Sequence, residues 1–287
     1  MNDVCGVEEI IGEVGMESSL SDAVGKRIKF ANPPINELVI AFFHLPIVEM
    51  KAQHIGMYWH RIRDKYPLCE QQPIIIVNSS GTQPLSEAPG EIFPLPRFWF
   101  SSDAHPTLIQ IQRNAFIFNW RRLAQNEYPH YETVLTDFWR ELEDYKIFVQ
   151  ELGGRGLEVI QRCELTYINV ISPNEFFTNP SQLMHVLPSI TSLADMQTDD
   201  RQMVGLNATA TYQVNPTLRV DLAIKLGRRT DETKELVAVL ELKAHGAPSG
   251  ISLEDARSWY GSAHDATYKM FLDTTAKQVQ ELIWKPL

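Results

Sequence analysis

The sequence has few cysteines and no long apolar run, and both shortages narrow the class of protein. The three cysteines, Cys5, Cys69 and Cys163, lie far apart in the 287 residues, which excludes a disulfide framework and a paired-cysteine metal site. No run of about eighteen or more apolar residues occurs, and the N-terminus is acidic where a signal peptide is basic. The sequence therefore predicts a cytoplasmic protein without a transmembrane segment.

Several motifs of common enzyme classes are also missing. The chain contains no GxSxG nucleophile elbow, no P-loop and no GxGxxG dinucleotide loop, and its eight histidines include no HxxxH or HExxH pair. The net charge of −10 disfavours a general phosphate-binding surface, because backbone contacts to nucleic acid need clustered Lys and Arg. These absences argue against acyl transfer, nucleotide hydrolysis, a bound cofactor or metal, and nucleic acid as the partner.

Hydrophobic alternation is clearest between residues 108 and 121. Ile109 and Ile111 fall on one side of an extended chain, and Phe116 and Phe118 fall on one side of the next. Residues 113–114 suit a tight turn, so we expect an antiparallel hairpin that pairs Ile111 with Phe116. From residue 131 the apolar spacing becomes helical, which predicts a long helix on the apolar face of the hairpin, with the stripe Val134, Leu135, Phe138, Leu142, Tyr145 and Phe148.

The rest of the chain has the same kinds of pattern. It predicts further strands at residues 37–44, 74–77, 157–171, 206–214, 217–226 and 235–244, and helices at residues 50–66, 180–193 and 253–272. The expected fold class is α+β, with one extended antiparallel sheet covered on one face by long aromatic helices.

The order of the predicted elements suggests two halves. Residues 31–152 and 157–287 each run strand, helix, antiparallel strands and long aromatic helix, which makes them candidate pseudo-repeats within one module. Residues 1–30 hold six acids with three bases only at the end, and form either a mobile leader or an arm that orders on a partner.

The predicted hairpin has a second, polar face. It carries Gln110, Gln112, Asn119 and Arg121, and we expect residues from the 157–171 strand to join it, namely Tyr167 and Asn169. Side-chain amides and a guanidinium on a sheet suit recognition of a peptide or an anion, because they offer fixed donors. The alternative is a buried hydrogen-bond network that links the two halves.

The clearest enzyme signal is the set Asp221, Glu241 and Lys243. An acid on one strand and an acid-x-Lys on the next can hold Mg²⁺ and activate water, as in metal-dependent nucleases. A hairpin centred near residue 231 would place Asp221 opposite Glu241. The alternative is a solvated face on which opposite charges pair across the hairpin.

Four strings carry a resemblance to a known family: NPPINELVIAFF, LIQIQRNAFIFNWR, CELTYINVI and AHDATYKMFLDTT. Together they resemble a sporadically distributed family of bacterial conserved hypothetical proteins. The resemblance implies a single cytoplasmic bacterial module, scattered among genomes as mobile or defence-associated genes are, and it implies no particular reaction.

Three functional hypotheses follow. The leading one is a non-enzymatic binding or assembly protein, with a protein partner or self-assembly, in an anti-phage defence or toxin–antitoxin operon. The second is a metal-dependent nuclease built on Asp221, Glu241 and Lys243. The third is a small-ligand sensor whose pocket lies over the polar face of the sheet.

Overall fold

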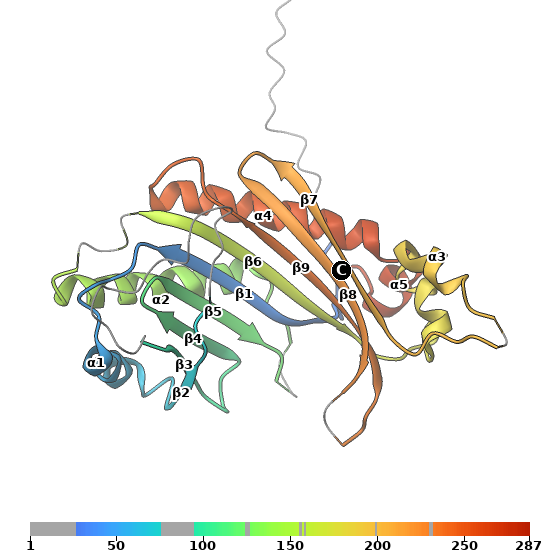
Figure 1. The fold of residues 1–287 in the computed structure, drawn as a ribbon, viewed down its shortest axis with the longest axis horizontal. Helices are drawn as coiled ribbons and strands as arrows, with labels where there is room; N and C mark the ends of the chain where they lie inside the picture. Colours follow the sequence, from blue (N-terminus) through green and yellow to red (C-terminus); the bar gives the residue numbers. More distant parts are fainter. Residues whose placement is uncertain are drawn as a thin grey trace, which may run out of the picture.

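The computed structural model of the chain describes residues 27–75, 95–123, 127–154, 157, 159–198, 200–229 and 232–287. Nine strands of these residues form one sheet in the order β2-β3-β4-β5-β1-β6-β9-β8-β7, and every neighbouring pair is antiparallel (Figure 1). The α+β prediction is confirmed in this form. The strands are β1 (Ile35–His44), β2 (Leu68–Gln72), β3 (Arg97–Ser101), β4 (Thr107–Gln112), β5 (Ala115–Arg121), β6 (Ile160–Ile171), β7 (Leu206–Asn215), β8 (Leu218–Arg228) and β9 (Leu236–Gly246).

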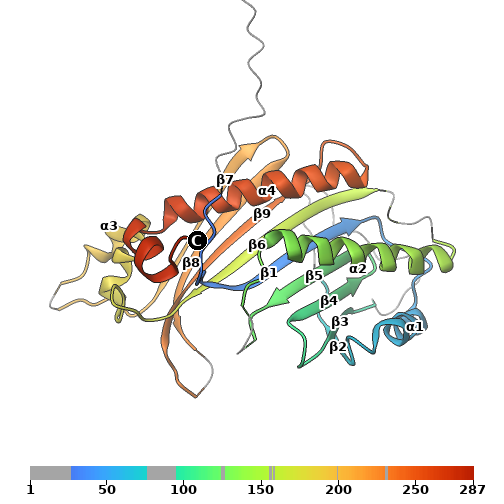
Figure 2. The same cartoon turned by 180° about the vertical axis from the view of Figure 1, so that it is seen from behind.

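Two long helices cover the same face of this sheet (Figure 2). They are α2 (Tyr131–Glu151), which follows β5, and α4 (Leu253–Thr274), which follows β9. Among the described residues, no helix combines the length and the apolar character needed to cross a membrane. The shorter elements are α1 (Ala52–Ile62), the 3₁₀ turns η1 (Pro180–His185) and η2 (Pro188–Ile190), α3 (Thr191–Ala194), α5 (Lys277–Val279) and the π-turn η3 (Gln280–Trp284).

The predicted central hairpin is present with the expected register. Ile111 lies opposite Phe116 across β4 and β5, and both side chains are fully buried. Helix α2 covers them, with Tyr145 stacked on Phe116 at a centroid distance of 5.1 Å. Gly153 follows the end of α2 with φ of 79°, a conformation that favours glycine and that commonly terminates helices.

Strand β1 lies at the centre of the sheet and is buried on both faces. Leu38, Ile40 and Phe42 face the helices and belong to the main hydrophobic core. Ala41 and Phe43 face the other way and form a smaller apolar cluster, together with side chains of β5. The apolar composition of residues 37–44 predicted this burial on both faces, and the structure confirms it.

Three sequence predictions differ from the structure. The edge strand is β2, which was not predicted because its sequence (LCEQQ) is short, polar and exposed and has no apolar alternation; of the strand predicted at 74–77, residues 74 and 75 are not in a strand and residues 76 and 77 lie outside the described residues. Residues 180–193 form separate short turns instead of one helix, since Pro188 has no N–H for an intrahelical bond. The hairpin of β8 and β9 pairs Asp221 with Lys243, which is two residues away from the predicted register.

The predicted leader lies largely outside the described residues. Its last four residues, 27–30, run along α4. Phe30 is buried there between Phe271 and Trp284, with both ring centroids 6.2 Å from its own.

Candidate functional site

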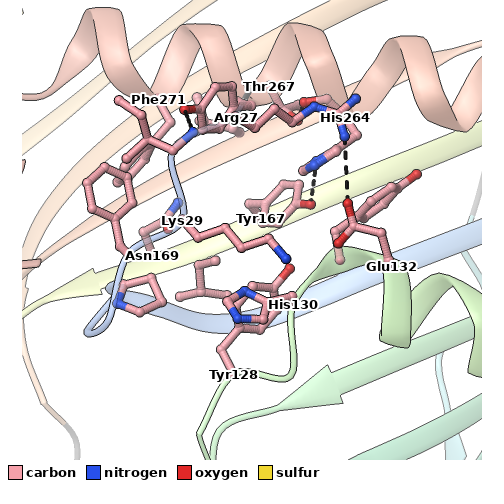
Figure 3. Close-up of a pocket in the computed structure, with 17 residues that line it drawn as sticks. Arg27, Lys29, Tyr128, His130, Glu132, Tyr167, Asn169, His264, Thr267 and Phe271 are labelled. Atoms are coloured by element: carbon pink, nitrogen blue, oxygen red, sulfur yellow. Dashed lines mark hydrogen bonds and ion pairs between the residues drawn. The ribbon is translucent and has the colours of Figure 1, made fainter. Parts of the chain in front are cut away.

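A cavity of about 110 Å³ lies on the helix-covered face of the sheet. Its walls come from residues 27–35, the start of α2, strands β6 and β9, and the middle of α4 (Figure 3). We call it the α2–α4 cavity. It lies where elements from both halves of the chain meet, because α2 belongs to the first half and β6, β9 and α4 belong to the second.

The alternation of β6 aims two of the predicted binding residues into this cavity. Tyr167 lies between Leu38 of β1 and Leu242 of β9 in the sheet, so its side chain is on the helix-covered face. Asn169 follows two residues later and is on the same face. Both residues line the cavity.

A stacked pair of rings, Tyr131 and the half-buried His264, forms one wall. The Tyr167 hydroxyl lies 2.8 Å from Nδ1 of His264, and the His264 ring stacks on Tyr131 at a centroid distance of 3.8 Å. Burial, assisted by the Arg27 guanidinium, lowers the pKa of His264 to about 3, so its imidazole is neutral at pH 7. Burial raises the pKa of Tyr167 well above its usual value, so Tyr167 is protonated at pH 7 and its hydroxyl is hydrogen-bonded to Nδ1, with the direction set by the His264 tautomer.

Asn169 contributes an unpaired acceptor near the cavity. Its side chain is 1% exposed, and its amide nitrogen donates to the backbone oxygen of Leu240 at 3.0 Å. Its carbonyl oxygen Oδ1 is buried and has no hydrogen-bond partner. Buried polar atoms are nearly always paired, so this one needs an explanation.

Charged residues surround the entrance of the cavity. Arg27 forms an ion pair and hydrogen bond with Asp265 of α4, and its NH1 group lies 3.7 Å from Oε1 of Glu132 of α2. The backbone nitrogen of Ile28 donates to the Tyr268 hydroxyl at 2.8 Å. These contacts hold residues 27–28 across both helices, and Figure 3 shows the Lys29 side chain reaching over the cavity.

The predicted polar face exists, but it is not an open surface. Gln110 is 4% exposed and Asn119 is 4% exposed, and they are joined by a 2.7 Å hydrogen bond from Nε2 to Oδ1. Trp99 donates to Gln110 at 2.9 Å, and Asn119 donates to Glu37 at 2.6 Å. Burial raises the pKa of Glu37.

The other two residues of that face are also placed by the structure. Gln112 accepts from and donates to the backbone of Ile75. Arg121 lies opposite Glu37 in the register of β1 and β5. Gln110, Gln112, Asn119 and Arg121 thus share one face, whereas Tyr167 and Asn169 are on the other, so the six predicted residues do not form one site. The buried network runs through β3, β4, β5 and β1 and stays within the first half.

The predicted nuclease set is divided among separate charge pairs. Asp221 accepts from the Thr211 hydroxyl at 2.7 Å and lies 3.1 Å from Nε2 of His245. Lys243 pairs with Glu164 at 3.0 Å, and Glu241 lies 4.0 Å from the Lys225 ammonium. In the described part of the chain, no group of three or more His, Cys, Asp or Glu side chains is arranged to hold a metal ion. Asp221, Glu241 and Lys243 are thus each paired with a different side chain.

Most residues of the cavity wall share no common pattern in the sequence. Arg27, Tyr131 and His264 come from three distant segments, and no spacing in the sequence connects them. The available signals were indirect: Tyr131 begins the amphipathic pattern of α2, and His264 lies among the apolar positions of α4.

No protein-family model matches this chain, and neither the search of curated proteins nor the search of solved structures returned a match. The function therefore has to be argued from the residues of the cavity.

Proposed function

We propose that this chain is a non-enzymatic binding protein and that the α2–α4 cavity is its small-ligand site. The observation that supports this most directly is the unpaired, buried Oδ1 of Asn169 in the cavity wall. Leaving a buried acceptor unpaired costs about 1 to 3 kcal/mol, which a ligand with a hydrogen-bond donor would recover. Around it, Leu242, Phe271 and Ile35 offer apolar contact.

The size of the cavity favours a ligand of about one ring. An engineered protein cavity of about 150 Å³ binds benzene, and the α2–α4 cavity is somewhat smaller at about 110 Å³. The stacked pair of Tyr131 and His264 adds an aromatic wall. The ligand class that fits is therefore a small, uncharged and mainly apolar molecule, such as a substituted ring, that carries one N–H or O–H donor.

The protonation states in the cavity favour binding over acid–base catalysis. A general acid or base works best when its pKa is near the working pH. His264 has a pKa of about 3, and the pKa of Tyr167 is raised well above its ordinary value, so neither group exchanges its proton readily at pH 7. Their hydrogen bond instead fixes the shape of the wall.

We also infer that the two halves of the chain are structural pseudo-repeats that meet at this cavity. Two features of the sheet support the inference. β1 pairs with β5, the last strand before α2, and β6 pairs with β9, the last strand before α4. β1 and β6 then pair with each other at the centre of the sheet.

Phenol and toluene test the role of Asn169, because they have similar shapes and only phenol carries a donor. We expect both to bind, and we expect the ratio of their dissociation constants to shift about 5- to 10-fold against phenol in Asn169→Leu, which corresponds to about 1 kcal/mol for one neutral hydrogen bond. Comparing the two ratios cancels the greater hydrophobicity of toluene. Isothermal titration or ligand-detected NMR provides the constants.

Gln71→Leu is the control, since it replaces an exposed amide on β2, far from the cavity in the sheet order. Its phenol-to-toluene ratio should equal that of the wild type. Failure of both compounds to bind the wild type would refute the ligand site, whereas an unchanged ratio in Asn169→Leu would show that Oδ1 does not receive the donor.

A further inference from the structure

Strand β7 forms one edge of the sheet and has an unusual composition for that position. It pairs with β8 alone among the described strands, and its other side lies at the margin of the sheet (Figure 1). Its ten residues, LNATATYQVN, include no charged residue and no proline. Proteins usually protect such an edge with lysine, proline, shortness or a bulge, because its free backbone groups can pair with another strand.

The protection on β7 is slight. Its one irregularity lies between Gln213 and Asn215, at the end of the strand, so that Leu206 to Gln213 pair regularly with β8. The opposite edge of the sheet is different. There β2 has five residues, half the length of β7, and includes the charged residue Glu70.

Side chains of β7 alternate between the two faces from Leu206 to Gln213, before the irregularity. Thr209 and Thr211 belong to the polar, uncharged face. The other face is apolar and is only partly covered, with Tyr212 49% exposed and Val214 48% exposed. Its members are Leu206, Ala208, Ala210, Tyr212 and Val214.

We propose that β7 is a homotypic assembly edge, which pairs antiparallel with β7 of a second copy of this chain about a twofold axis near Ala210. Antiparallel pairing keeps each side chain on its own face. Ala208 would therefore lie opposite Tyr212 of the second copy, and Thr209 opposite Thr211. In this pairing, apolar side chains are cross-strand neighbours of apolar side chains, and uncharged polar side chains are neighbours of uncharged polar side chains.

Charge is the reason to assign a second copy to this edge. Each chain carries a net charge of −10, so two copies repel each other wherever charged surfaces meet. In a twofold pairing a charge near the axis would also lie close to its own duplicate. A ten-residue edge without any charge avoids both penalties. The pairing would join two nine-stranded sheets into one and cover Tyr212.

Matched charge variants test the assembly in the full chain. We expect the wild type to sediment as a dimer, and Thr209→Lys/Thr211→Lys and Thr209→Glu/Thr211→Glu each to sediment as monomers. Like charges opposite each other should raise the dimer dissociation constant about 100-fold or more. An equimolar mixture of the two variants should restore the dimer, because each lysine then faces a glutamate. This restoration separates loss of pairing from loss of folding.

Gln71→Lys, which adds one lysine to the β2 edge, is the control and should remain dimeric. A monomeric wild type would overturn the proposal and assign the edge to a strand of another protein. A lysine variant that stays dimeric, or variants with intact circular dichroism spectra whose mixture stays monomeric, would overturn it as well.

Discussion

Replacing Phe138 with alanine is expected to lower the free energy of unfolding by about 3 to 5 kcal/mol, the usual cost of truncating a buried phenylalanine. Phe138 is fully buried at the point where both long helices meet the sheet. Its ring centroid lies 6.1 Å from that of Phe116 in β5 and 5.6 Å from that of Tyr260 in α4. The truncation would leave a cavity among three elements that cannot all move inward.

The control lies on the same helix. Ile147 is 42% exposed, so Ile147→Ala removes little buried surface, and we expect its free energy of unfolding to change by less than about 0.5 kcal/mol. Urea denaturation followed by circular dichroism gives both values. Equal losses in the two variants would show that Phe138 is not packed as described.

The elements that sequence predicted well are those with a strong local period. The register of β4 and β5 follows from alternating side chains on both arms and a turn of two residues between them. The bounds of α4 follow from its apolar spacing and from the Ser252 cap, whose hydroxyl accepts from the Asp255 backbone nitrogen. Such features depend on neighbours in the chain.

The predictions that failed depend on contacts between distant segments. The loop between β8 and β9 is long and charged, so it does not fix where pairing begins, and the predicted register was two residues off. Tyr167 and Asn169 were expected on the polar face of the hairpin, but the pairing of β6 with β1 and β9 places them on the helix-covered face. Both residues lie there, held by a hydrogen bond to His264 and one to the backbone of Leu240.

The polar face illustrates a second limit. The sequence indicated that Gln110 and Asn119 share a face, which is correct, but it left open whether that face binds a ligand or is buried. The face is buried because its amides have hydrogen-bond partners in other strands, namely Trp99 in β3 and Glu37 in β1. A chain of amides that satisfies its own donors and acceptors has little left to offer a ligand.

The protein should also lose stability in mild acid because of two histidines, the buried His44 and the half-buried His264. His44 is 1% exposed, and burial lowers its pKa to about 4, while the pKa of His264 is lowered to about 3. In the unfolded chain both groups titrate near their ordinary value of 6.5. The unfolded state therefore binds more protons below this value, so stability is full above it and falls as the pH decreases towards the folded pKa values.

Between pH 7 and pH 5 each histidine is expected to remove roughly 2 kcal/mol of the free energy of unfolding. Glu37, whose pKa is raised by burial, acts in the opposite direction, because it adds stability as the pH falls through its raised folded pKa towards the ordinary value of 4.5. His44→Gln cannot titrate and should lose about half of this pH dependence, whereas His60→Gln, on the exposed side of α1, should keep all of it. Urea denaturation at the two pH values measures the difference. Equal stability of the wild type at pH 7 and pH 5 would contradict the neutral state of both rings in the folded protein.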